Sequence, residues 1–160
     1  MTEQISYKKS SLLGFAFAFG LKHVRRETLR IMARTLLEGK RNRILLAKNA
    51  AGKIVGYIVA RPCPKKYAFA EKGEWMVGPY YVLPAHRGHG IGTELLLQME
   101  NLCCSEKYCA YVLVQNIGSC TAFEKAGYEK IGFMKQGEDG RFSLSDNGNF
   151  YVFRKEVATP

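Results

Sequence analysis

Residues Tyr81–Leu96 read YVLPAHRGHGIGTELL and hold the most informative pattern of the chain. The apolar start of this segment completes a β-prone run from Trp75 to Val82, and Pro84 ends that strand. A glycine-rich turn follows and opens a helix from about Gly90 to Lys107. The segment therefore predicts a strand, a turn and a helix, with a buried helical stripe of Leu95, Leu96, Met99 and Leu102.

The glycine-rich turn has the chemistry of a pyrophosphate site. Glycines let the backbone approach an anion closely, and the first amides of the helix add donors and a partial positive charge. Arg87 and His89 add donors from side chains. The turn is not a P-loop, because no Gly-Lys-Ser/Thr follows, and it fails GxGxxG, because Thr93 stands where the last glycine would be.

The segments on either side predict a mixed α/β fold. Apolar residues at helical spacing indicate a helix from about Arg25 to Glu38, and the run at 12–21 fits a helix or a strand, with a helix favoured. Asn49-Ala50-Ala51-Gly52 joins two strands as a hairpin, and Gly127 ends a short helix. The predicted strands are 43–47, 54–60, 75–82, 111–114, 128–135 and 150–156, and the short helix is 119–125, with a turn-rich segment at 137–149.

A length of 160 residues fits a single domain. We expect N-terminal helices at about 12–38, a core at about 43–156, and short tails up to about Ser6 and from Ala158. Five cysteines without a CxxC pair, and three histidines without ligand spacing, predict reduced thiols and no metal site. Lys8, Lys9 and the run at 12–21 resemble a signal peptide, but that run continues into a helical pattern, so a cytoplasmic protein is favoured over a secreted one.

The positive charge is concentrated near the N-terminus. The net charge is +10, and residues 1–50 carry eleven Lys or Arg against three Asp or Glu. A solvated helix face is the favoured interpretation, and a surface that steers an acidic partner is the alternative. No motif for reading DNA or RNA accompanies these charges, so a specific nucleic-acid partner is not expected.

Two ordered motifs resemble the GNAT superfamily of acyl-CoA N-acetyltransferases. Arg87, Gly90 and Gly92 match its Arg/Gln-x-x-Gly-x-Gly/Ala signature. A second block, from Asn116 through Ser119 to Tyr128, is similar to the family's Asn-x-x-Ala/Ser and Glu-Lys-x-Gly-Phe/Tyr elements. The resemblance covers about Arg43 to Glu156 and implies a mostly antiparallel twisted sheet flanked by helices. Within that sheet, a splayed parallel strand pair would bind coenzyme A.

The resemblance also implies roles for individual residues. The strand backbone near Val82 would pair with the pantetheine arm and stabilise the oxyanion, the turn amides would hold the pyrophosphate, and Asn116 would contact the cofactor. An amine would attack acetyl-CoA directly in a ternary complex, with a base for the amine and an acid for the thiolate. The implied cofactor contacts are Tyr81, Val82, Arg87, Gly88, His89, Gly90, Ile91, Gly92, Thr93, Asn116 and Phe123.

The chain departs from the family at the proton donor. Phe123 stands where relatives usually carry the tyrosine that acts as the general acid, and phenylalanine cannot donate a proton. Ser119 is the substitute donor that the resemblance suggests, and a helix N-cap is its alternative role. Glu74 is the only carboxylate near the strand, and an exposed strand-end position is its alternative. Tyr80, Tyr81 or a water chain are further options for the base.

Three functions stay open at this stage. The leading one is transfer of acetyl from acetyl-CoA to a primary amine of a small molecule or a protein N-terminus, with an acidic acceptor possible. The first alternative is a coenzyme A-binding regulatory module without catalysis. The second is a nucleic-acid-binding protein that uses Arg25, Arg26 and Arg30. The sequence does not give the acceptor or the oligomeric state, and a homodimer stays possible.

Overall fold

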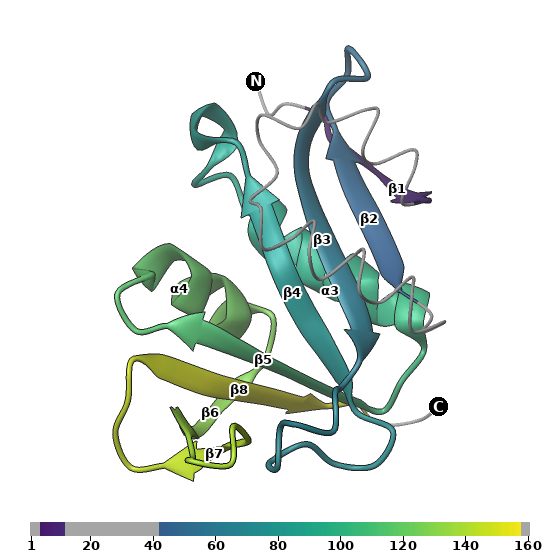
Figure 1. The fold of residues 1–160 in the computed structure, drawn as a ribbon. Helices are drawn as coiled ribbons and strands as arrows, with labels where there is room; N and C mark the ends of the chain where they lie inside the picture. The colour runs from purple at the N-terminus through teal and green to yellow at the C-terminus, as the bar shows by residue number, and fades with distance from the viewer. Residues whose placement is uncertain (1–3, 12–41, 158–160) are drawn as a thin grey trace.

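The computed structural model describes residues 4–11 and 42–157, which form a sheet with helices packed on it (Figure 1). The strands lie in the order β1-β2-β3-β4-β5-β8-β6-β7. Neither helix of the described part has the length and hydrophobicity to cross a membrane. The elements are β1 Ser6–Ser10, β2 Arg43–Lys48, β3 Ile54–Pro62, β4 Trp75–Val82, η1 Pro84–His86, α3 Ile91–Cys103, β5 Lys107–Leu113, α4 Ile117–Lys125, β6 Glu129–Gln136, β7 Phe142–Ser145 and β8 Phe150–Glu156.

Strands β4 and β5 form the parallel pair of the sheet, and the other neighbouring strands are antiparallel. The two strands pair only at Trp75 with Tyr108 and Met76 with Cys109. Beyond these pairs they diverge, and Figure 1 shows their carboxyl ends pointing in different directions. The carboxyl end of β4 leads to α3 and that of β5 leads to α4, so both helices begin at the open side of the pair.

Both helices pack on the same face of the sheet. Figure 1 shows α3 behind β2, β3 and β4, while α4 lies beside β5. The predicted stripe of α3 is buried at Leu95, Leu96 and Met99, each 0% exposed, and Leu102 is partly buried at its edge. Burying such side chains contributes roughly 1.5–3 kcal/mol each. The core therefore fixes where the first turn of α3 meets the end of β4.

The structure confirms the predicted fold class: a mixed α+β domain with a large, mostly antiparallel sheet and a parallel β4–β5 pair. The hairpin, β4, β6 and β8 lie close to their predicted ranges. The predicted helices at 12–21 and 25–38 lie outside the described residues.

Two strands were not predicted, and three predicted boundaries are wrong. Strand β1 lies between the predicted tail and the predicted helices, where no strand was expected. Its lysines suit an edge strand, which among the described residues pairs only with β2. The turn-rich segment holds β7, a strand of four residues too short to show a period. Helix α3 stops at Cys103 because Cys104 adopts a left-handed conformation with φ of 51°. As a result β5 begins at Lys107, and α4 begins two residues earlier than predicted.

Candidate active site at the splayed strands

The open end of β4 presents its backbone toward β5. The amide of Leu83 donates to the carbonyl of Val55 on β3, so alternation along the strand turns the backbone of Val82 and of Tyr80 away from β3. Tyr81 pairs with Tyr57 and turns its own backbone toward β3. The two residues that can pair with an extended ligand are therefore Tyr80 and Val82, whereas the sequence indicated Tyr81 and Val82.

A β-bulge interrupts β4 before these residues. Val77 pairs with Ala60 and Tyr80 with Ile58, so three steps on β4 match two on β3. The extra residue falls at Gly78-Pro79, and Gly78 has φ of 120°. Bulges bend a strand and re-aim the side chains that follow. Here the bulge lies at the point where β4 parts from β5.

The glycine-rich turn leaves the start of α3 open. Gly88 and Gly90 have φ of 80° and 78°, and no atom lies within 4 Å of a Cβ placed at either position. Gly90 is the N-cap and supplies no side-chain bond. The amides of Ile91, Gly92 and Thr93 therefore have no capping acceptor, and they carry the positive end of the helix dipole. This arrangement fits a pyrophosphate.

Arg87 is anchored at the mouth of the turn. Its Nε donates to the carbonyl of Val82 at 2.9 Å, and its guanidinium lies 5.4 Å from the ring centroid of Tyr81. The side chain therefore ties the end of β4 to the turn while keeping its charge at the surface. His89 is also exposed in the turn.

Helix α4 places two predicted residues at the far side of the open pair. Asn116 is the N-cap, and its Oδ1 accepts from the Ser119 amide at 3.2 Å. The cap role that the sequence offered Ser119 thus belongs to Asn116. Ser119 is half-buried, and its side chain lowers the pKa of the neighbouring Tyr80 phenol.

Phe123 lies in the core and not at the surface of α4. It is 2% exposed, and its ring stacks on Phe153 with a centroid distance of 5.3 Å. Tyr80 packs against it edge-on, with centroids 5.8 Å apart and an interplanar angle of 73°. The Tyr80 ring therefore packs between β4 and Phe123 of α4.

Glu74 lies at the opposite end of β4 from Val82. Its side chain is fully buried; Oε1 accepts from Arg154 Nε at 2.9 Å, and Oε2 accepts from the Glu71 amide at 2.9 Å. Eight steps along the strand separate it from Val82, a span of roughly 26 Å. Neither the exposed position nor the base role suggested by the sequence matches this geometry, which is that of a structural ion pair.

Glu74 is also part of a compact cluster with two thiols. Ligand atoms of Cys63, Glu74 and Cys109 lie within 4.8 Å of one another, and the two sulfurs are 3.5 Å apart. Because Arg154 and a backbone amide already occupy the carboxylate, the cluster does not offer an open metal site. The hydrogen bond with Cys63 and burial raise the pKa of the Cys109 thiol, which keeps that thiol protonated.

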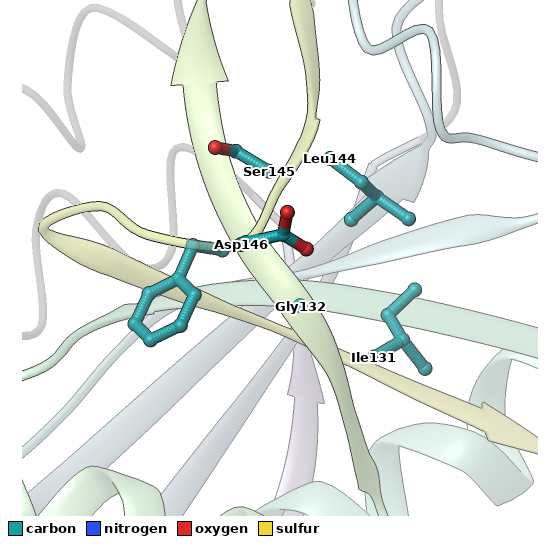
Figure 2. A pocket seen from close by; sticks show the side chains of 6 residues that line it. Ile131, Gly132, Leu144, Ser145 and Asp146 are labelled. Carbon is teal, nitrogen blue, oxygen red and sulfur yellow. The ribbon is translucent and has the colours of Figure 1, made fainter.

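A hollow of about 440 Å³ lies between β6 and β7, away from the open pair. Figure 2 shows the side chains of Ile131, Leu144 and Asp146 around Gly132. The sheet order places β8 between this hollow and β5. The hollow therefore lies outside the candidate site.

Comparison with known proteins gives a consistent result. The model of the acetyltransferase (GNAT) family matches residues 13–128. A phosphinothricin acetyltransferase from Sinorhizobium meliloti, solved in complex with acetyl-CoA, is 18% identical over 98% of this chain and 89% of its own, with a TM-score of 0.66. A ribosomal-protein-alanine N-acetyltransferase from Brucella melitensis is 21% identical over 87% and 83%, with a TM-score of 0.59. At these identities the likeness shows a shared fold. No match is found among curated protein sequences.

Proposed function

The chain belongs to the GNAT acetyltransferase family and is an acyltransferase, and on that premise we propose that it moves acetyl from acetyl-CoA to a primary amine. The acceptor class is a small molecule or a protein N-terminus, attacked directly in a ternary complex. The observation that carries the proposal is the uncapped start of α3 beside the open end of β4.

Coenzyme A fits the residues at this place. The amides of Ile91, Gly92 and Thr93 would hold the pyrophosphate, and exposed Arg87 and His89 would add positive charge or donors around it. The backbone edge of Tyr80 and Val82 would pair with the amide groups of the pantetheine arm, as an added strand does. The solved neighbour with acetyl-CoA bound supports the same cofactor.

Asn116 and Ser119 lie at the start of α4, at the open side of the strand pair. The cap bond uses only Oδ1 of Asn116, so its side-chain NH₂ is available to contact the cofactor. The Ser119 hydroxyl would act on the sulfur end through its neighbour Tyr80. Glu74 has no part in the proposal, and water is the acceptor of the amine proton.

The charge of the chain bears on the class of acceptor. The net charge of +10 favours a neutral or acidic acceptor over a polycation such as a polyamine, because like charges repel. We place the reaction in the cytoplasm, where acetyl-CoA is found.

The test is acetyl transfer by purified protein to a panel of amines, followed through release of the free thiol. The panel should contain amino acids, amino sugars, antibiotics, polyamines and peptides with a free N-terminus. We expect turnover with at least one acidic or neutral amine, together with saturable binding of coenzyme A. Tight coenzyme A binding without turnover on any amine would favour the regulatory module, and absence of both would refute the proposal.

A further inference from the structure

The loss of the tyrosine on α4 is matched by a tyrosine on the strand that faces it. Residue 123 is phenylalanine, and the ring that packs edge-on against it belongs to Tyr80. Ser119, at the start of α4, acts on the pKa of the Tyr80 hydroxyl and is therefore its neighbour. A phenol is thus present between β4 and α4 although α4 does not carry it.

The start of α3 also lies next to the Tyr80 side chain. A Cβ at Gly92 would lie 3.3 Å from Cε2 of Tyr80 and 3.9 Å from its hydroxyl oxygen. Glycine at this position therefore leaves room for the tyrosine ring as well as for an anion. The hydroxyl is placed at the junction of β4, α3 and α4, where the backbone of Tyr80 also faces β5.

We propose that the Tyr80 hydroxyl is the catalytic acid that protonates the departing thiolate, and that Ser119 positions it; this inference rests on the proposed acetyl transfer. Two sequence features would then be linked. Tyr80 supplies the proton that Phe123 cannot, and Ser119 acts through Tyr80 and not on the sulfur itself.

The protonation state of the phenol agrees with this role. Burial raises the pKa of Tyr80 above its ordinary value of 10.0, so the group is protonated at neutral pH. The neighbouring Ser119 side chain acts in the other direction and lowers the pKa. Ser119 therefore stabilises the phenolate that forms for a moment when the proton leaves.

The proton balance closes without another reagent. The amine nitrogen bonds to the acetyl carbon, the carbon–sulfur bond breaks, and its electron pair stays on sulfur. Tyr80 gives its proton to that thiolate, and the acylated nitrogen loses one proton to water. Solvent returns a proton to the phenolate, so the products are an amide and a free thiol, with Tyr80 restored.

The structure supplies a matched control for this phenol. Tyr128 also packs edge-on against Phe123, with centroids 5.0 Å apart and an interplanar angle of 90°. It is 3% exposed and lies in the core behind that ring. Tyr80→Phe and Tyr128→Phe therefore remove the same atom from two neighbours of one ring, and only the first removes it beside the open strand pair.

The experiment measures both catalysis and the bound product. We expect Tyr80→Phe to lower kcat by about 100-fold, at the lower end for a lost general acid, with coenzyme A affinity within about threefold of wild type. In the binary complex, ultraviolet titration should show the pKa of the bound thiol rise by about one unit, because the thiolate loses a hydrogen bond. Tyr128→Phe should change neither quantity.

The outcomes separate this inference from the proposed function. An unchanged thiol pKa together with an unchanged kcat in Tyr80→Phe would overturn the role of Tyr80 while acetyl transfer stands. If wild-type protein binds coenzyme A but acetylates no amine, the titration alone decides, since it needs no acceptor. A Tyr128→Phe variant that loses as much as Tyr80→Phe would also overturn the inference, because the effect would then come from packing.

Discussion

The placement of the pyrophosphate at Gly90 can be tested by adding a charge there. Gly90→Glu would bring a carboxylate to the cap of α3, about 5 Å from an anion held by the first amides. At an effective dielectric constant of about 20, one pair of like charges at that distance repels by roughly 3 kcal/mol. We therefore expect coenzyme A affinity to fall by at least about 100-fold.

The variant also carries a backbone cost that needs its own control. A non-glycine residue in the left-handed region costs roughly 1–2 kcal/mol. Gly52 in the β2–β3 turn has φ of 76°, against 78° at Gly90, and neither position has an atom within 4 Å of an added Cβ. Gly52→Glu should therefore lose similar stability in urea unfolding but keep its affinity, and Gly90→Ala should show the strain without the charge.

Isothermal titration calorimetry with coenzyme A distinguishes the results. Wild-type affinity in Gly90→Glu would refute the placement of the pyrophosphate. Equal losses in Gly90→Glu and Gly52→Glu would mean that the loss reflects general destabilisation and not the site.

Three further predictions concern side chains around the sheet and α4. Glu74→Gln should lower the free energy of unfolding by about 3 kcal/mol, because partly buried Arg154 loses its charged partner. The kcat per folded molecule should not change. A large loss of kcat at unchanged stability would restore Glu74 as a base. Asn116→Asp keeps the cap acceptor but removes the side-chain NH₂, so unfolding in urea should be unchanged while coenzyme A binding weakens several-fold. Asn116→Ala should weaken binding in the same way and also lose about 1 kcal/mol of stability. Equal affinity in the wild type and both variants would remove Asn116 from the site. The hydrogen bond from Lys107 and the charge of Arg154 lower the pKa of Glu71 from 4.5. Its stabilising effect is therefore present above pH 4.5 and is lost as the pH falls through the lower pKa of the folded state. The difference in unfolding free energy between wild type and Glu71→Gln should shrink on acidification, and a constant difference would contradict this.

The sequence was most informative where the chemistry is local. The strand, turn and helix around Arg87–Gly92 follow from proline, glycine and apolar spacing, and the structure places them as predicted. The family resemblance then supplied the parallel pair, because no local pattern shows which strands will lie side by side.

The side-chain partners of the site could not be predicted in this way. The ion pair of Glu74 with Arg154 joins residues 80 positions apart, and nothing in the sequence marks it. The position of Tyr80 depends on a bulge that shifts register by one residue, which alternation alone misses. A tyrosine directly after Gly78-Pro79, in a chain with phenylalanine at 123, was the signal that could have indicated it.

The most direct test of the account is a crystal structure of the protein with coenzyme A bound. We expect pyrophosphate oxygens at about 3 Å from the amides of Ile91, Gly92 and Thr93, the pantetheine arm beside Tyr80 and Val82, and the sulfur within hydrogen-bond distance of the Tyr80 hydroxyl. Coenzyme A bound elsewhere, for example in the hollow between β6 and β7, would contradict the central claim.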